Sequence, residues 1–289
     1  MKSLNQLKVL IVGLGQIGGS LGMDLVKKRL VAEVVGFDID KTLAKKAKRL
    51  RAVDSMANSL SEGIGKADLI ILAIPIREIK KLIPFVGQYI KKETVVLDVG
   101  STKVEILRRV SELDQRINFI GGHPLAGSEK CGLKAAQAGK FANTTFVLIP
   151  FPETKSEWVS TVKKLVRSLG AKPLFMTAEE HDRLIALTSS LPYLFSIALM
   201  HQAAKYEEKY KKIWDLVGGS FISATRVARS SPGLTLDMFL ANRKNVGNVI
   251  EQMMVELANL KQMIEKGEEK TLKNLIKQVK KKREMIQSG

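Results

Sequence analysis

Short apolar runs alternate with amphipathic stretches from residue 8 to about residue 175. The runs are rich in β-branched residues and fall at Val9–Val12, Val34–Phe37, Leu69–Ala73, Val95–Val99, Phe119–Ile120 and Phe146–Ile149. Most are separated by segments of helical periodicity, among them Leu21–Lys28, Ile79–Ile90 and Trp158–Leu169. Continuous apolar strands that alternate with helices are typical of a parallel sheet covered on both faces. We therefore predict a doubly wound α/β domain.

The pattern becomes helical after Pro173. Thr177 followed by Glu180 is a capping-box signature for the start of a helix. We place a domain boundary near residue 174. The chain then divides into a dinucleotide-binding α/β domain over 1–174 and an all-α domain over 175–289.

Proline and glycine punctuate the all-α domain. Pro192 is expected to kink or interrupt its first long helix, and Pro232-Gly233 to mark a turn. Segments 241–265 and 268–287 have helix periodicity on either side of Gly267. Because these helices are apolar on several faces, we expect them to pack also on a second subunit, in a homodimer.

A glycine-rich turn follows the first strand, with the residues Gly13, Leu14, Gly15, Gln16, Ile17 and Gly18. Gly13 permits a tight turn, Gly15 lets the backbone approach a pyrophosphate, and Gly18 lets the following helix pack closely. Asp38 ends the next strand, about 20 residues on, where it can accept hydrogen bonds from ribose hydroxyls. The combination predicts a Rossmann-like dinucleotide site, with a structural glycine turn in an unrelated domain as the alternative.

The carboxyl ends of other strands are expected to complete this site, since they line the ligand crevice of a doubly wound sheet. An acid at Asp38 repels the 2′-phosphate of NADP, so we expect NAD, although Lys41 nearby weakens that preference. Ala73 and Pro75 end one strand and are expected to contact the cofactor. Ser101 follows the next strand and should lie near the nicotinamide ring, and a helix N-cap is its competing interpretation.

The first candidate for chemistry is His123, within Gly121-Gly122-His123-Pro124 directly after a strand. This composition predicts a constrained loop. An imidazole there can take a proton from a hydroxyl while the adjacent carbon gives hydride to NAD, and a structural histidine is the alternative. His181, next to Asp182, is expected to orient or support instead of reacting. No cluster of histidines and carboxylates predicts a metal site.

Several motifs together resemble the prephenate/arogenate dehydrogenases of tyrosine biosynthesis. They are Gly-Leu-Gly-Gln-Ile-Gly-Gly-Ser at 13–20, Asp-Val-Gly-Ser-Thr-Lys at 98–103, Gly-Gly-His-Pro-Leu-Ala-Gly-Ser-Glu at 121–129, His181-Asp182, Ser189–Tyr193 and Thr225–Ala228. The resemblance spans nearly the whole chain. The His-Pro-Leu-Ala-Gly segment with the downstream Thr-Arg-Val-Ala is far more specific than the glycine turn.

The resemblance implies an oxidative decarboxylation of prephenate to 4-hydroxyphenylpyruvate. His123 matches the histidine that deprotonates the substrate 4-hydroxyl, and Ser101 matches a serine that bridges this hydroxyl, the histidine and the nicotinamide. Arg226 matches an arginine that pairs with a substrate carboxylate, although its helical context alone favours a solvated arginine. Ser189 and Tyr193 are expected to bind the substrate as well.

Two segments depart from the family pattern. Ser189–Tyr193 contains no histidine where many relatives have one, and Tyr193 carries no charge at neutral pH. Pro232–Thr235 lacks an aromatic residue found in some members. Both leave open whether prephenate or arogenate is preferred and whether tyrosine inhibits.

Composition narrows the class of protein further. The formal net charge of +18 is concentrated in a C-terminal lysine-rich helix without interleaved aromatic residues, so we read a solvated face and expect no nucleic-acid partner. The apolar stretch 9–26 contains five glycines and fits a strand, turn and helix; no other segment was expected to approach membrane-spanning length. The single cysteine, Cys131, cannot form an internal disulfide, which favours a soluble cytoplasmic protein.

The leading hypothesis is thus an NAD-dependent prephenate dehydrogenase. An enzyme that uses arogenate, or both substrates, is the nearest alternative. A non-catalytic dinucleotide sensor belongs to a different class, and the joint presence of His123, Ser101 and Arg226 speaks against it.

Overall fold

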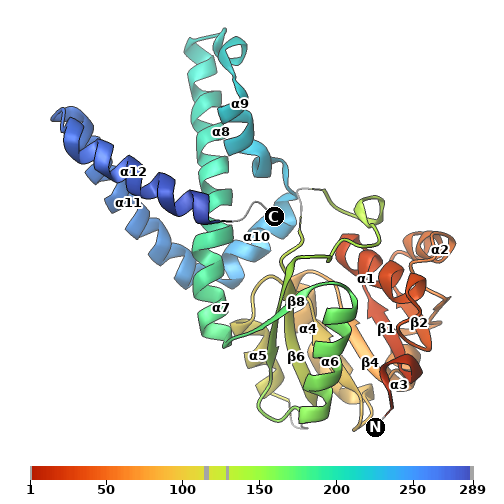
Figure 1. Ribbon diagram of the computed structural model, residues 1–289. Helices are drawn as coiled ribbons and strands as arrows, with labels where there is room; N and C mark the ends of the chain where they lie inside the picture. Colours follow the sequence, from red (N-terminus) through yellow and green to blue (C-terminus); the bar gives the residue numbers. More distant parts are fainter. Residues whose placement is uncertain (1, 114–116, 128–129, 287–289) are drawn as a thin grey trace. The chain divides into compact units, whose positions relative to one another are not determined.

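The computed structural model describes residues 2–113, 117–127 and 130–286 (Figure 1). The chain divides into two compact units, Met1–Asn242 and Arg243–Gly289. Each unit has more contacts within itself than with the other unit. The domain boundary near residue 174, which differs from this division, stays a prediction.

A mixed sheet forms the base of the first unit, and within the described residues it has eight strands in the order β3-β2-β1-β4-β5-β6-β7-β8. The strands are β1 (Lys8–Val12), β2 (Glu33–Phe37), β3 (Ser55–Met56), β4 (Leu69–Leu72), β5 (Val95–Asp98), β6 (Asn118–Pro124), β7 (Thr145–Pro150) and β8 (Lys172–Phe175). The sequence pattern did not indicate β3 or β8. The order of the first six strands is that of a dinucleotide-binding sheet.

The expectation of a wholly parallel sheet is wrong at one place, because β6 and β7 pair antiparallel. A parallel neighbour needs a long crossover, usually a helix. Between these two strands the described residues contain only a 3₁₀ turn at Leu133–Ala135. The chain therefore returns beside β6 in the opposite direction.

Helices cover both faces of the sheet, as predicted (Figure 1). They are α1 (Gln16–Lys27), α2 (Lys41–Arg49), α3 (Leu60–Lys66), α4 (Ile76–Tyr89), α5 (Val104–Ser111) and α6 (Ser156–Ser168). Strand β1 shows how the layers form: Val9 and Ile11 join the core under α1, α2 and α6, whereas Leu10 and Val12 join the core under α3, α4 and α5. Alternate side chains of a strand point to opposite faces, so the central strands must be apolar throughout.

The rest of the first unit is helical. It comprises α7 (Ala178–Ile185), a π-helical turn (Ala186–Ser190), α8 (Leu191–Lys209), α9 (Gly219–Thr225), a 3₁₀ turn (Arg226–Arg229) and α10 (Pro232–Ala241), with further 3₁₀ turns at Leu4–Gln6 and Ile213–Leu216. Thr177 caps α7, since its Oγ1 accepts a hydrogen bond from the Glu180 amide at 3.1 Å. Arg77 of α4 forms an ion pair with Asp237 of α10 at 2.9 Å, which ties the helices to the sheet layer.

Two prolines act differently from expectation. Pro192 does not break the helix; the chain widens into the π turn just before it, and α8 continues. Pro232 does not mark a turn, because it is the first residue of α10. Proline fits a first helical position well, since its ring presets the backbone angle and no amide partner is needed there.

The second unit is a pair of helices, α11 (Arg243–Glu265) and α12 (Glu269–Met285), as the periodicity predicted. Gly267 separates them with φ of +65°, a left-handed conformation that favours glycine after a helix. Large apolar side chains remain exposed on both helices, including Met254, Ile264 and Ile276.

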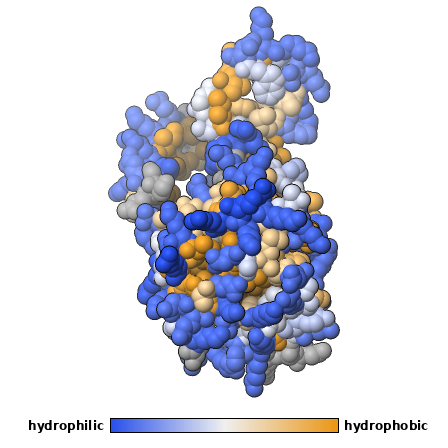
Figure 2. Space-filling view, turned by 90° about the vertical axis from the view of Figure 1, so that its right-hand side faces the viewer, coloured by the Kyte–Doolittle hydropathy of each residue, from blue (hydrophilic) through white to orange (hydrophobic). Residues whose placement is uncertain are grey.

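The continuous helical stretch Ala178–Lys209 is long and apolar enough to cross a membrane, by length and composition only, which corrects the expectation that no further segment approaches this length. A single such helix is weak evidence, because core helices of soluble proteins pass the same test. Only 28% of its most apolar window is buried. Apolar patches are visible at the top of Figure 2. The exposed large apolar side chains of α8 and α9 include Phe195, Leu199 and Ile222.

Candidate active site

The glycine turn has the shape that its sequence predicted. Gly13 has φ of +91°, and a Cβ there would lie 2.5 Å from the carbonyl oxygen of Ala73. A Cβ on Gly18 would lie 1.9 Å from the carbonyl oxygen of Gly13. At Gly15, in contrast, a Cβ would meet no atom of the described residues within 4 Å. The protein itself thus requires the outer two glycines, whereas the middle one faces space open to a ligand.

The start of α1 fits the same interpretation. Gly15 is the N-cap and has no side chain to satisfy the first amides of the helix, which begins at Gln16. Free amides at a helix N-terminus attract phosphate. Ile17 packs part of its side chain against the core, so it is the main chain of this residue that faces the turn.

Asp38 lies against the glycine turn at the end of β2. Its Oδ2 accepts a hydrogen bond from the amide of Leu14 at 2.8 Å, and its Oδ1 accepts one from the amide of Asp40 at 2.9 Å. The carboxylate is partly exposed beside Ile39, whose side chain is 94% exposed. Its binding to ribose stays a prediction.

Two further predicted cofactor residues lie at the same edge of the sheet. The amide of Ala73 donates to the carbonyl of Val12 at 2.8 Å, which holds the end of β4 beside the end of β1. Pro75 is the N-cap of α4. Strands β2 and β4 lie on either side of β1, which leads into the glycine turn. Both are followed by residues predicted to contact the cofactor, Asp38 after β2 and Ala73 after β4.

His123 belongs to a strand, which corrects the expectation of a loop. It is the penultimate residue of β6 and pairs with Val147 of β7. The glycines before it fit the packing between strands: a Cβ on Gly122 would lie 2.6 Å from the carbonyl oxygen of Asp98. What looked like loop composition is thus a strand with too little room for side chains.

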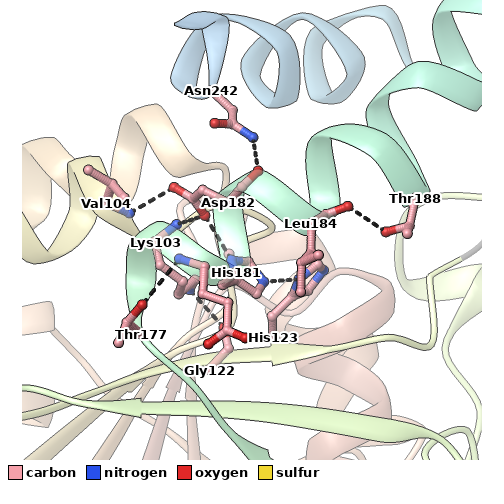
Figure 3. A network of polar contacts seen from close by, with 12 residues as sticks. Lys103, Val104, Gly122, His123, Thr177, His181, Asp182, Leu184, Thr188 and Asn242 are labelled. Carbon is pink, nitrogen blue, oxygen red and sulfur yellow. Dashed lines mark hydrogen bonds and ion pairs between the residues drawn. The ribbon is translucent and has the colours of Figure 1, made fainter. Parts of the chain in front are cut away.

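A chain of hydrogen bonds connects His123 to an acid on another element (Figure 3). Nδ1 of His123 lies 2.9 Å from Nε2 of His181, and Nδ1 of His181 lies 2.7 Å from Oδ1 of Asp182. His181 and Asp182, both on α7, are 1% exposed. An ionised carboxylate only accepts, so Nδ1 of His181 is the donor to Asp182. Nε2 of a neutral His181 then accepts from Nδ1 of His123, which leaves Nε2 of His123 without a proton.

Burial lowers the pKa of His123 well below its ordinary value of 6.5, and the neighbouring His181 and Lys103 lower it further. Burial disfavours the charged imidazolium, and a positive charge nearby disfavours a second one beside it. The imidazole is therefore neutral over the physiological range, the form in which it can accept a proton.

Asp182 also caps a helix of the sheet layer. Its Oδ1 accepts from the amide of Lys103 at 2.8 Å and its Oδ2 from the amide of Val104 at 2.9 Å, at the start of α5. Asn242 in turn donates to the carbonyl of Asp182 at 2.6 Å. Since Asp182 supplies this cap from a distant segment, the interpretation of Ser101 as the N-cap of α5 is wrong. Ser101 is partly exposed in the bend after β5.

The residues predicted to bind substrate lie on the helical layer. Ser189, partly buried in the π turn, has its Oγ 3.9 Å from the sulfur of Met238, and Tyr193 is partly exposed on α8. Arg226 lies on the 3₁₀ turn that packs against α8, where the amide of Ala228 donates to Ser196 at 3.0 Å. Their contacts with substrate stay predictions.

Sequence reasoning gave His181, next to Asp182, a supporting role but missed the cap that Asp182 provides and the buried ion pair of Lys103 with Asp98. A motif cannot show which distant backbone amides an acid will reach. Ser128 and Glu129, the last residues of the motif around His123, lie outside the described residues. Among the residues that the structure describes, no group of three or more potential ligands is arranged to hold a metal ion.

Comparison with protein families assigns both halves of the chain. The family model for the prephenate dehydrogenase nucleotide-binding domain matches residues 21–174, and the model for the prephenate dehydrogenase dimerization domain matches residues 177–278. The chain belongs to the prephenate dehydrogenase family. Membership confirms the predicted fold class and the oxidoreductase class.

Relatives that resemble this chain are named either prephenate dehydrogenase or cyclohexadienyl dehydrogenase. Prephenate dehydrogenase of Bacillus subtilis is 30% identical over 96% of this chain and 76% of its own length. Cyclohexadienyl dehydrogenase of Zymomonas mobilis is 28% identical over 89% of this chain and 88% of its own.

Solved structures agree with this assignment. Prephenate dehydrogenase from Aquifex aeolicus in complex with hydroxyphenyl propionate and NAD+ is 30% identical and covers 98% of this chain and 99% of its own, with a TM-score of 0.91. Arogenate dehydrogenase from Synechocystis is 29% identical and covers 96% of this chain and 99% of its own, with a TM-score of 0.82.

Proposed function

We propose that the protein catalyses the NAD-dependent oxidative decarboxylation of prephenate to 4-hydroxyphenylpyruvate, a step of tyrosine biosynthesis. The observation that carries the proposal is the chain from His123 through His181 to Asp182, at the sheet edge that also holds the glycine turn. Family membership and the relative solved with NAD+ and hydroxyphenyl propionate support it. The open approach at Gly15 and the uncapped start of α1 fit a dinucleotide pyrophosphate.

The reaction balances with the groups at hand. NAD+ supplies the hydride acceptor. Nε2 of His123 takes the proton of the 4-hydroxyl while the carbon that bears it loses hydride and becomes a carbonyl carbon. Loss of CO2 from the ring carboxylate leaves its electron pair in the ring, which becomes aromatic as a phenolate. The protonated His123 returns its proton to this oxygen, which gives the phenol. Asp182 and His181 keep His123 in the tautomer that accepts this proton, as an acid does for the histidine of a catalytic triad.

The remaining predicted residues are assigned to binding. Ser101 is proposed to bridge the substrate hydroxyl and His123, and Arg226 to pair with a substrate carboxylate through its planar guanidinium. Ser189 and Tyr193 are proposed to contact the three-carbon side chain of the substrate. Gly13, Gly15, Gln16, Ile17, Gly18, Asp38, Ala73 and Pro75 are proposed to hold NAD.

Formation of NADH from prephenate tests the proposal. We expect turnover with prephenate and NAD at micromolar protein, followed as absorbance of NADH, with release of one CO2 per NADH. Arogenate is the second candidate substrate, supported by the cyclohexadienyl and arogenate dehydrogenases among its relatives. Parallel assays with both substrates, each with and without tyrosine, distinguish the two and reveal any inhibition by product-like ligand. No NADH with either substrate would contradict the assignment.

We also propose that the protein works as a homodimer in the cytoplasm, assembled through its helical domain from residue 175 onward. The dimerization-domain match and the exposed apolar side chains of α8 and α9 support the first part, because such surfaces are normally covered. The exposed free thiol of Cys131 suits a reducing compartment. Light scattering after size exclusion should give twice the chain mass, and cell fractionation should place the protein in the soluble fraction.

A further inference from the structure

An ion pair is buried directly beneath the strand that carries His123. The side chains of Lys103 and Asp98 are both 0% exposed, and the ammonium contacts Oδ2 of Asp98. The same ammonium donates a hydrogen bond to the carbonyl of Gly122 at 2.7 Å. Apolar residues of similar volume are often as stabilising as a buried ion pair, so stability is a weak reason for charges at this position.

The strand before His123 is adapted to this pair. Asp98 of β5 pairs with Gly121 of β6. A Cβ on Gly121 would lie 3.0 Å from Cδ of Lys103, and on Gly122 it would lie 2.8 Å from a side-chain carbon of Leu97. The two glycines therefore leave room for the lysine stem and the strand that faces it.

Lys103 also contacts Asp182, at one end of the histidine chain, and Gly122, the residue before His123 at the other end (Figure 3). Its main-chain amide donates to Asp182 at 2.8 Å, and its ammonium binds the residue before His123. Asp98, its ionic partner, accepts from the amide of Gly100 at 2.8 Å, next to Ser101. Lys103 thus connects the acid at the far end of the chain, through its main chain, with the strand that carries His123, through its ammonium. Its partner Asp98 extends the connection to the bend that carries Ser101.

We propose that Lys103 is a positioning residue of the active site, whose buried ammonium fixes the strand that carries His123 relative to the bend that carries Ser101. The role rests on the proposed function, since it serves a histidine that accepts a proton. Lys103 does not contact the reacting atoms; it acts through the strand and the field at His123.

The charges that face His123 decide the sign of the effect. His181 and Asp182 approach from α7, Lys103 from the start of α5 and its partner Asp98 from β5, while β7 places the apolar Val147 opposite. Burial lowers the pKa of Lys103 and raises that of Asp98, and their mutual attraction opposes both shifts. Lys103 lowers the pKa of His123. Removing the pair should raise it, so that activity is lost at higher pH as the solution is acidified.

The test removes both charges together, in Asp98→Asn/Lys103→Met, so that neither is left buried alone. The chain contains three histidines, so ring resonances in NMR spectra are few, and an exposed-site variant, His201→Gln, identifies one of them. We expect the pKa of His123, measured without substrate, to rise by about one unit, near the lower end of what one close charge produces. The acid limb of kcat/KM for NADH formation should move up with it, and kcat should fall about tenfold.

Each result decides the matter. A folded double variant in which the His123 titration and the acid limb stay in place would show that the pair serves packing alone. If the double variant does not fold, the unaltered protein still tests the premise, because the pKa of His123 must lie well below its ordinary value of 6.5. A pKa of His123 at or above that value would overturn the proposal. Because the NMR titration needs no turnover, failure of the proposed reaction would be seen separately, as absent NADH formation beside an unchanged His123 shift.

Discussion

The glycine turn and the histidine chain lie at the same edge of one sheet but are built in opposite ways. The turn is made of backbone within six consecutive residues, Gly13 to Gly18, together with one acid from the next strand. The histidine chain is made of side chains from segments 58 residues apart, where His123 meets His181. A site built from backbone depends on which residues lack a side chain, whereas a site built from side chains depends on tertiary packing. Substitutions should therefore affect the two by different routes.

The largest effect is expected at His123, the proposed proton acceptor. His123→Asn preserves approximate size but cannot accept the hydroxyl proton, so kcat should fall about 1000-fold, within the usual range for a general base. NADH formation measures kcat, and NAD affinity measured by fluorescence should stay within twofold. His201→Asn, on the exposed face of α8, is the matched control and should leave kcat unchanged. Retention of most activity in His123→Asn would disprove its role.

Substitutions at two glycines of the turn should affect different properties, the stability of the fold at Gly18 and the binding of NAD at Gly15. Gly18→Ala places a methyl 1.9 Å from a backbone oxygen and should lower the free energy of unfolding by about 3 kcal/mol, as overpacking does at its upper range. Gly15→Ala meets no atom of the described residues within 4 Å, so stability should hold while the Kd for NAD rises about tenfold. Chemical denaturation measures the free energy of unfolding of each variant, and calorimetric titration measures its Kd for NAD. Equal losses of stability in both variants would contradict the assignment of Gly15.

Asp182 should affect both stability and chemistry, since it caps α5 and holds His181. Asp182→Asn loses the charge and one acceptor, and we expect kcat to fall about 100-fold with a stability loss of about 1 kcal/mol. Ser59→Ala removes the N-cap of α3, far from the histidines, and is the control for a lost cap. It should cost about the same stability and no activity. If Asp182→Asn and Ser59→Ala had similar kcat values, Asp182 would serve only as a helix cap and would have no role in the chemistry.

The smallest effect on catalysis is expected at Asp38, the carboxylate beside the glycine turn. Asp38→Ala removes the proposed ribose acceptor and the bond to Leu14, so the ratio of kcat/KM for NAD to that for NADP should fall about tenfold. Asp54→Ala removes a comparable bond to the backbone of Val34 in the same strand and should leave the ratio unchanged. An unchanged ratio in Asp38→Ala would refute its contact with the ribose.

The same contrast explains how much could be predicted from the sequence. The glycine turn, the covering helices and the cap at Thr177 follow from local rules of backbone geometry and periodicity, and each was found. The antiparallel pairing of β7 and the strand position of His123 were missed, because Gly-Gly-His-Pro has loop composition and only the packing of Asp98 and Leu97 explains its glycines. The role of Asp182 as a cap for α5 depends on a contact over 78 residues, which no local pattern contains.

The π turn at Ala186–Ser190 has a consequence for how the family can vary. A π turn holds one residue more than an α-helical turn, and each residue of an α-helix advances it by about 100°. Deleting one residue from this turn would rotate α8 by that angle relative to α7. His181 would keep its place beside His123, but Tyr193 would face a different direction. A single insertion or deletion here is therefore a route by which evolution can exchange the side chains that α8 is proposed to offer to the substrate, while the proposed proton acceptor stays in place.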